Sequence, residues 1–448
     1  MSEATLSSQM AAFVSRLFFD DLSDEHLKKI KFYFLDWLGS AYGGKKERPT
    51  GILLELVHSM GGKPDSTILA DGSKTMCLLA ALINGASSHV LEMDDLHRKS
   101  IFHPACAIIP AVLAIAEREN ASGKDLLLGI SIGYEIGVRV ALGVGPSHYH
   151  FWHTTATCGT FGAAAGAAKI LALDEEQFVW AMGSAGTQAS GLWEFLVDSA
   201  MSKQLHPGKA AFNGLLAALL AKGGFTGAQK ILEGEKGFFR ATSSKFDEQI
   251  CLHRLGEEFF CETNSLKYYA SCGHTHAAID AVLKATKSES MTPDKIKQVD
   301  VSIYQASLDL LENIEPKSPY LAKFNLPFCI ATALRYGHTN LDDFTEQRLN
   351  DQDLHLIMER VNIRSDPELT NCYPHKWPAE VKIYTTDGQC LQACTDYPKG
   401  DPENPLEEHE VIAKFKSLTN KILSDSKADR IVERVMDLEN LDNVAMLL

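Results

Sequence analysis

Apolar residues recur at helical spacing over most of the first 260 positions. One helix is predicted to start at Ser23-Asp-Glu, where a capping residue precedes two acids, and to end at Gly43-Gly44. Further helices are predicted over 105–119, 125–140, 159–171 and 210–221. In the helix predicted over 125–140, Gly129, Gly133 and Gly137 lie four residues apart. That spacing predicts close packing against another helix backbone.

The pattern changes near Lys267. Residues 298–304 alternate with period two and are rich in β-branched side chains, which predicts a strand. Two more strands are predicted over 379–385 and 389–394, and the Asp387-Gly388 turn between them indicates a hairpin. Helical segments at 325–336 and 354–361 lie between the strands. This part of the chain therefore predicts a smaller α+β domain.

The end of the chain is again helical, from Glu407 to Leu448, after a Pro-rich return at 398–405. We expect this tail to pack back on the first helices and to make their domain discontinuous. The predicted architecture has two domains, a large all-α helical domain and a smaller α+β domain. Their ranges are 1–266 for the first part of the helical domain, 267–397 for the α+β domain and 398–448 for the return.

Composition limits the classes of function. The chain has 448 residues, a length that favours two or three domains. Of these residues 45% are hydrophobic and 23% are charged, as in soluble globular proteins. There is no run of eighteen apolar residues, and the N-terminus lacks a signal-like apolar core, so we expect a cytoplasmic protein. Ten scattered cysteines without a CxxC pair suit free thiols. The net charge of −15 argues against nucleic-acid binding, so an anionic ligand would need locally gathered cations.

The densest group of titratable side chains lies at 90–104, between two apolar, alanine-rich segments. It contains three carboxylates, two imidazoles, one guanidinium and one ammonium group, from Glu92, Asp94, Asp95, His97, His103, Arg98 and Lys99. Burying so much charge is costly unless the groups are paired or used, which suggests a functional loop. A solvated connection between two helices is the other interpretation.

A second group, 148–153, contains three histidines and stands before a Gly/Ala-rich helix. The threonines that follow are natural N-caps, and the free N–H groups of that helix would favour an anionic group. No cysteine or carboxylate lies beside the histidines at a familiar ligand spacing, which disfavours a metal. A histidine that acts as a general acid or base is the better interpretation.

Two further groups carry cationic side chains. Lys203, His206 and Lys209 precede the next apolar helix, where a lysine would clamp a carboxylate or act as a base, unless this is an ordinary basic loop. Lys267 opens a stretch that ends at Asp280 and contains Cys-Gly-His-Thr-His. That motif alone is a weak zinc signal and also fits a polar junction between the domains. Lysine, histidine and tyrosine groups thus precede alanine-rich helices within an acidic chain.

Six ordered blocks resemble the MmgE/PrpD family over nearly the whole chain. The blocks begin with Leu91-Glu-Met-Asp-Asp and His103-Pro, followed by His153-Thr-Thr-Ala-Thr-Cys-Gly-Thr-Phe-Gly and Ser202-Lys-Gln-Leu-His-Pro-Gly-Lys. They continue with Lys267-Tyr-Tyr-Ala-Ser-Cys and His276-Ala-Ala-Ile-Asp, Ala322-Lys-Phe-Asn-Leu-Pro-Phe, and Pro398-Lys-Gly-Asp-Pro-Glu-Asn-Pro.

This resemblance implies a large helical domain completed by the C-terminal tail, a smaller α+β domain, an active site in the cleft between them, a homodimer, and chemistry without a redox cofactor. Family activities are 2-methylcitrate dehydration, cis-aconitate decarboxylation and iminodisuccinate epimerisation, all on small polycarboxylates. By position, the family's site residues correspond to Glu92, His103, His153, Lys203 and His276.

Three departures bear on the subfamily. Leu96 and Phe328 stand where many relatives place Thr and Tyr, and the loop to His103 is one residue longer. These differences disfavour the dehydratase and the decarboxylase, and the length and block pattern look most like the iminodisuccinate epimerase branch. We therefore expect a cofactor-independent, metal-free epimerase that removes and returns a proton beside a carboxylate. The alternatives are a lyase of the family, a catalytically silent binding protein of the same fold and, more remotely, a metal-dependent hydrolase.

Roles are expected for nine side chains. His153 and Lys203 would transfer protons, and Tyr149 would be the acid on the opposite face. His103, His276 and Lys267 would hold substrate carboxylates, with Arg98 nearby. Glu92 and Asp94 would orient the histidines.

Overall fold

A computed structural model describes residues 4–198, 200–311 and 314–448, and its packing divides them into two units. The helical unit comprises the described residues of 1–90, 94–264 and 407–448, and the smaller unit those of 91–93 and 265–406. The sequence division at 266 and 397 stays a prediction about domains. In the packing, the Pro-rich segment belongs to the smaller unit, where the Leu266 N–H donates to the Gly400 carbonyl.

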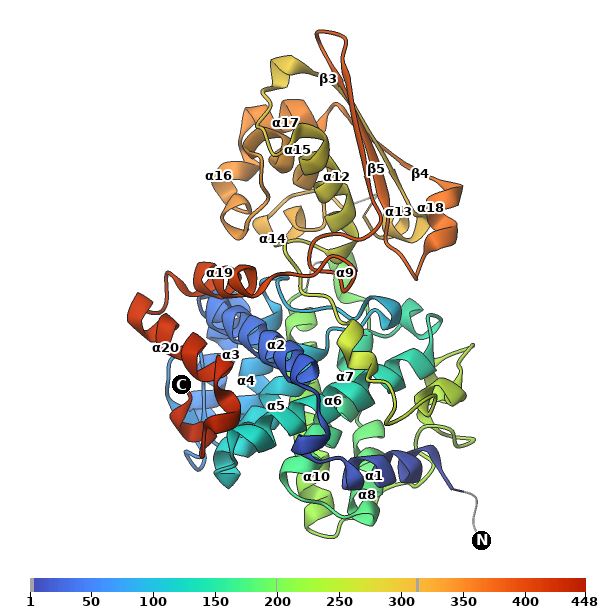
Figure 1. The fold of residues 1–448 in the computed structure, drawn as a ribbon, viewed down its shortest axis with the longest axis vertical. Helices are drawn as coiled ribbons and strands as arrows, with labels where there is room; N and C mark the ends of the chain where they lie inside the picture. The colour runs from blue at the N-terminus through green and yellow to red at the C-terminus, as the bar shows by residue number, and fades with distance from the viewer. Residues whose placement is uncertain (1–3, 199, 312–313) are drawn as a thin grey trace. The chain divides into compact units, whose positions relative to one another are not determined.

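The helical unit is built from helices apart from one two-stranded ribbon. Its helices are α1 (Leu6–Arg16), α2 (Asp24–Gly43), α3 (Arg48–Met60), α4 (Cys77–His89), α5 (Pro104–Glu119), α6 (Gly123–Val144), α7 (Thr154–Ile170), α8 (Glu175–Gly186), α9 (Phe195–Asp198), α10 (Ser202–Lys222), α11 (Phe238–Thr242), α19 (Glu408–Thr419) and α20 (Asp425–Met436). The antiparallel ribbon pairs β1 (Ser66–Thr67) with β2 (Lys74–Thr75). Helix α19 of the tail packs on α2, as Figure 1 shows for the red and blue helices.

Small residues let the central helices approach closely. Helices α4, α5, α7 and α10 enclose an apolar cluster that is mostly alanine. A Cβ on Gly85 of α4 would lie 2.9 Å from the Cα of Gly208 in α10, and a Cβ on Gly162 of α7 would lie 2.7 Å from the Gly133 carbonyl oxygen in α6. Both separations are too short for a side chain. The close packing predicted for Gly133 is therefore confirmed.

Other predictions for this unit are confirmed in detail. The Ser23 hydroxyl caps α2 by accepting the His26 N–H, and α5 ends at Glu119 as expected. Helix α6 is long and apolar enough to cross a membrane by length and composition, but 94% of its most apolar window is buried. A buried core helix passes the same test, so this is weak evidence for a membrane span.

The smaller unit packs helices beside a four-stranded sheet. Its elements are α12 (His276–Thr286), β3 (Ile296–Ile303), α13 (Gln305–Leu311), α14 (Pro319–Ala322), α15 (Leu326–Tyr336), α16 (Glu346–Leu349), α17 (Gln352–Met358), β4 (Val361–Ser365), α18 (Pro367–Cys372), β5 (Ala379–Thr385) and β6 (Cys390–Thr395). The strand order is β4-β3-β5-β6, with β3 and β4 parallel and the other neighbours antiparallel.

The predicted hairpin is confirmed, because β5 and β6 pair in antiparallel register and Gly388 in their turn has φ +91°. The prediction of a helix up to Val361 is wrong at its end. Helix α17 stops at Met358, and Val361 begins β4. The residues of β4 pair with the side of β3 that faces away from β5. A tertiary contact of this kind overrides local propensity.

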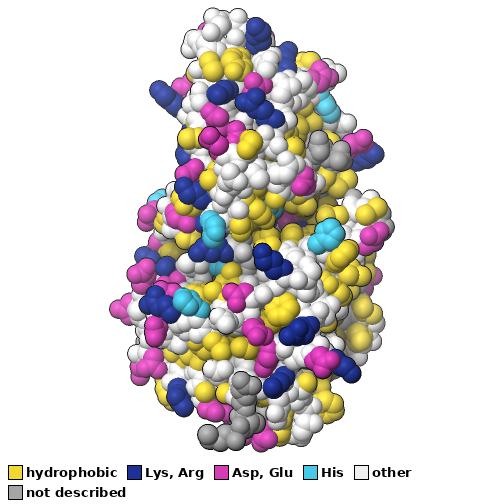
Figure 2. Space-filling view, turned by 90° about the vertical axis from the view of Figure 1, so that its right-hand side faces the viewer, with side chains coloured by type: hydrophobic (Ala, Val, Ile, Leu, Met, Phe, Trp, Pro, Cys, Tyr) yellow, Lys and Arg dark blue, Asp and Glu magenta, His cyan; other side chains and the backbone are white. Residues whose placement is uncertain are grey.

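Acidic and basic side chains are interspersed on the face drawn in Figure 2. That face shows no broad field of one sign. A cationic site in this acidic chain must therefore be local, as its composition already indicates.

Candidate active site

Two histidines, His153 buried and His103 half-buried, stand at helix N-termini in the helical unit. His103 is the N-cap residue of α5 and His153 that of α7. The expectation that threonines cap α7 is wrong, because Thr154 and Thr155 already lie within its first turn. The Thr155 hydroxyl instead accepts the backbone N–H of His103 at 3.2 Å, which ties the start of α5 to the start of α7.

A third helix N-terminus joins these two. His206, in the second turn of α10, places its Nδ1 3.0 Å from Nδ1 of His153. Lys203, in the first turn of α10, is 3% exposed. Its charge is close enough to help lower the pKa of His153. The first N–H groups of each helix lack intrahelical partners and carry positive potential. Three such helix ends converge on one buried cluster.

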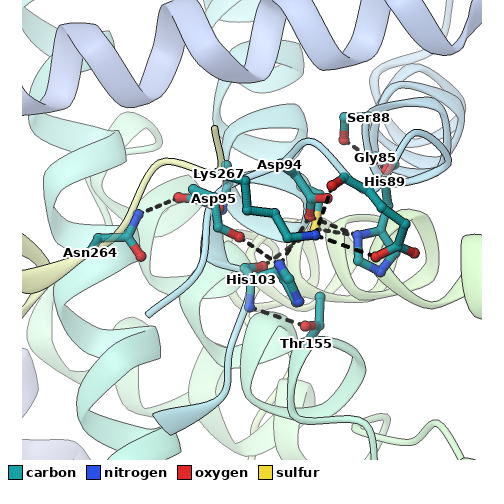
Figure 3. A network of polar contacts seen from close by, with 12 residues as sticks. Gly85, Ser88, His89, Asp94, Asp95, His103, Thr155, Asn264 and Lys267 are labelled. Atoms are coloured by element: carbon teal, nitrogen blue, oxygen red, sulfur yellow. Dashed lines mark hydrogen bonds and ion pairs between the residues drawn. The ribbon is translucent and has the colours of Figure 1, made fainter. Parts of the chain in front are cut away.

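Asp94 links two of the imidazoles. One of its oxygens lies 2.7 Å from Nδ1 of His89 and 3.4 Å from Nδ1 of His103 (Figure 3). Nδ1 of His103 also lies 2.6 Å from the Asp95 carbonyl oxygen, which can only accept, so this nitrogen carries the hydrogen. Asp94 therefore contacts two imidazoles, and its expected role in orienting histidines stays a prediction.

His89 was not foreseen from the sequence. It is the last residue of α4, fully buried, and its ring lies 5.1 Å from that of His103 and 5.7 Å from that of His153. Its Nε2 is buried without a hydrogen-bond partner in the described part of the chain. Such an atom is costly unless a ligand or water completes it. The signal in the sequence was the polar end of an otherwise apolar helix.

Burial keeps the paired histidines neutral. It lowers the pKa of His153 well below its usual value, with the neighbouring His206 and His89 adding to the effect. It also lowers the pKa of His206 to about 3, with help from the charge of Lys209. A neutral imidazole can accept a proton or share one with its neighbour. A bound anion would raise both pKa values, because it favours the charged form.

Asp95 anchors the 90–104 loop through hydrogen bonds to three neighbouring groups. Its carboxyl group accepts a hydrogen bond from the Asn264 amide at 2.6 Å, as Figure 3 shows. It also accepts the Tyr134 hydroxyl at 2.8 Å and the Ala105 backbone N–H at 3.0 Å. Burial raises its pKa to about 8, and the charge of Asp94 adds to the rise, whereas the donors oppose it. The group therefore holds the loop in place in a largely protonated form at neutral pH.

Two predicted residues of the helical unit lie at different places around this cluster. Tyr149 is half-buried, and its ring packs against Trp193 at 4.8 Å, which in turn lies 4.8 Å from His153. Trp193 was not foreseen. Arg98 is buried in a 3-10 turn, where its charge helps to lower the pKa of the neighbouring His97. These contacts neither exclude nor require contact with a substrate, so both roles stay predictions.

The remaining predicted residues belong to the smaller unit. Glu92 adopts a left-handed conformation with φ 58°, and its carboxylate lies 3.4 Å from Nζ of Lys267 and accepts a hydrogen bond from the Tyr320 hydroxyl at 3.3 Å. Nζ of Lys267 also donates to the Glu92 carbonyl at 2.8 Å. Glu92 and Lys267 thus contact each other, and their expected roles toward the substrate stay predictions. Nε2 of His276 lies 3.3 Å from the Ser271 carbonyl oxygen.

Three buried side chains of the helical unit could supply metal ligands. The donor atoms of His89, Asp94 and Cys106 lie within 4.8 Å of one another. However, Nδ1 of His89 and the Asp94 oxygen are 2.7 Å apart, closer than the ~3.3 Å expected between two ligands of a tetrahedral zinc ion. Burial and the Asp94 charge also raise the pKa of the Cys106 thiol well above its usual value. The trio fits a hydrogen-bonded cluster better than a metal site.

Comparison with known proteins gives matches over the whole chain. Residues 8–250 match the MmgE/PrpD N-terminal domain and residues 269–439 the MmgE/PrpD C-terminal domain. The cis-aconitate decarboxylase of Aspergillus terreus is 25% identical over 474 aligned residues, which cover 100% of this chain and 96% of that protein. The human cis-aconitate decarboxylase is 23% identical over 465 residues, covering 99% and 94%. Because the N-terminal domain alone matches more than half of the sequence, the chain belongs to the MmgE/PrpD family.

Proposed function

We propose that this enzyme is a lyase that removes CO₂ from a small unsaturated polycarboxylate of the cis-aconitate type. The convergence of three helix N-termini, four imidazoles and Lys203 is the observation that carries the proposal, because it gathers positive potential in a chain of net charge −15. Similar proteins named for cis-aconitate decarboxylation support the lyase over the epimerase that the length and block pattern indicate.

The reaction needs an electron sink and a proton. When the bond to one carboxylate breaks, CO₂ leaves and the electron pair stays on carbon, spreading through the C=C bond towards a retained carboxylate. A proton then adds to carbon. Fixed dipoles and cations that face the retained carboxylate stabilise this charge, and helix N-termini supply them without reorganisation.

His153 and Lys203 are the proposed proton-transfer groups. His153 shares a hydrogen bond with His206, so a proton can pass between the two rings as a bound anion raises their pKa values. His103, whose Nδ1 contacts the Asp95 carbonyl oxygen and the Asp94 carboxylate, is proposed to hold a carboxylate of the substrate. Tyr149, Arg98, His276, Lys267, Glu92 and Asp94 keep their proposed roles around the substrate.

Other expectations follow from the composition and from the family resemblance. We expect a cytoplasmic homodimer that uses no redox cofactor and binds neither nucleic acid nor membrane. Gel filtration with light scattering tests the dimer directly.

Proton NMR of the purified protein in D₂O tests the proposed reaction. With cis-aconitate, we expect the substrate vinylic signal to disappear, CO₂ to be released, and a decarboxylated product to carry deuterium at the protonated carbon. Exchange of an α-proton of iminodisuccinate, with new stereoisomers and no alkene, would establish the epimerase instead. Dehydration of 2-methylcitrate would identify the other lyase. A His153→Ala preparation made in parallel excludes a contaminating enzyme.

A further inference from the structure

A cavity of about 570 Å³ lies within the smaller unit, where α12 and α15 end. Its walls include three lysines, together with an exposed tyrosine ring, a threonine and an asparagine. These residues are Lys284, Lys287, Lys399, Tyr268, Thr339 and Asn340. None of them has a role in the proposed reaction. The volume is typical of sites for small molecules.

The charge in this cavity is opposite to that of the chain as a whole. Two helix C-termini contribute about −0.5 charge each, and Asp280 is the one acidic side chain of the cavity wall. The formal charge of the three lysines exceeds this negative charge, and Nζ of Lys399 also donates to the Pro405 carbonyl oxygen at 3.2 Å. Burial raises the pKa of Asp280, and its oxygens already accept the Tyr269 hydroxyl and the Lys399 backbone N–H. The cavity is therefore locally cationic.

Several donors around the cavity have spare capacity. Nζ of Lys284 donates to the Thr395 hydroxyl at 3.0 Å, a neutral acceptor that uses one of its three hydrogens. Within the described part of the chain, the Lys287 ammonium group has no ion-pair or hydrogen-bond partner. The Thr339 hydroxyl is likewise without a partner, although this residue is only 1% exposed. An unpartnered buried hydroxyl in a cavity that is also lined by Lys284 and Lys287 indicates a missing acceptor.

We propose that this cavity binds a small molecule with two or more anionic groups, such as a phosphate ester or a polycarboxylate. Carboxylate and phosphate oxygens are the acceptors that the ammonium groups and the Thr339 hydroxyl need. The ring of Tyr268, 41% exposed, offers an apolar wall for the rest of the ligand. The site lies within the smaller unit and shares no residue with the imidazole cluster. It does not depend on the proposed reaction.

Isothermal titration calorimetry tests this site with pyrophosphate and, separately, with citrate as the probe. The double variant Lys287→Gln/Lys399→Gln is compared with the wild-type protein and with Lys297→Gln, which removes an exposed lysine of β3 away from the cavity. We expect the double variant to bind at least one probe about tenfold more weakly or worse, because each lysine loses a charged hydrogen bond, and the control to bind normally.

The two probes distinguish the ligand sources, since the one with the larger loss identifies a phosphate or a carboxylate ligand. An unchanged melting temperature and unchanged turnover in the double variant show that it folds and that the imidazole cluster is intact. Equal affinity of wild-type and double variant for both anions, or no saturable binding of either anion to the wild-type protein, would overturn the proposal.

Discussion

In the helical unit, imidazoles are buried at helix N-termini and exchange hydrogen bonds with one another and with aspartates, whereas in the smaller unit lysines carry the positive charge. His153 and His206 are neutral because burial lowers their pKa values. Lys267 is held by the Glu92 carboxylate, and Lys287 faces an open cavity. The first arrangement can change its charge when an anion binds, and the second keeps a fixed charge. The difference supports the proposed proton transfer in the helical unit and the proposed additional anion site in the smaller unit.

Replacing His153 gives the strongest test of proton transfer in the helical unit. His153→Ala should lower kcat/KM for the substrate by about 10²–10⁴-fold, the usual contribution of a positioned acid or base. His150→Ala, on the same segment but exposed, should keep the wild-type value. Steady-state kinetics on cis-aconitate measure both. Full turnover by His153→Ala would remove this residue from the reaction.

The buried Glu92–Lys267 ion pair tests the fixed charge of the smaller unit. Both side chains are almost fully buried, so Lys267→Met should destabilise the protein by about 3–5 kcal/mol, because it leaves a buried carboxylate without its cation. Lys317→Met, in an exposed pair with Glu315, should change stability by less than about 0.5 kcal/mol. Urea denaturation measures both values.

The double variant Glu92→Gln/Lys267→Met completes this test. Its loss should be smaller than the sum of the two single losses, because removing both charges leaves neither unpaired. Additive losses would mean that the two groups do not stabilise each other.

His89 tests whether the imidazole cluster works as a unit. His89→Ala removes the partner of Asp94 and should lower kcat by about 10–100-fold with little change in KM, the equivalent of one charged hydrogen bond. His89→Asn retains an N–H donor near the position of Nδ1 and should recover part of the loss. Equal kcat in wild-type and His89→Ala proteins would make His89 a packing residue only.

How far the sequence predicts this molecule depends on whether a feature is local. Capping at Ser23, the glycine spacing around Gly133 and the turn at Asp387-Gly388 are local, and each specifies its element. Strand β4 needs the edge of β3, which lies some sixty residues earlier in the chain, so its short pattern was taken for the end of a helix.

The candidate site follows the same rule. The clusters that contain His103, His153 and Lys203 stand out because titratable groups precede apolar helices. The contact of His153 with His206 and the place of His89 depend on how closely α4, α7 and α10 pack, since Gly85 and Gly208 set the separation of two of them. The pairing of Glu92 with Lys267 joins residues 175 apart in sequence. Spacing along the chain carries no information about such contacts.

Asp95 gives the smallest expected effect per step, a pH dependence of stability that separates its buried carboxyl group from the ion pairs. Its native pKa of about 8 lies above the ~3.9 of an unfolded chain, so between these values the native state holds one more proton. Stability from this group is therefore present at low pH and falls as pH rises, by about 1.4 kcal/mol per pH unit between roughly pH 5 and 7.5. Asp95→Asn removes this contribution, so the stability of the wild-type protein relative to the variant should fall with that slope in urea denaturation. Parallel profiles would mean that Asp95 is ionised throughout, stabilised by the Tyr134, Asn264 and Ala105 donors, and that the loop is held by charge.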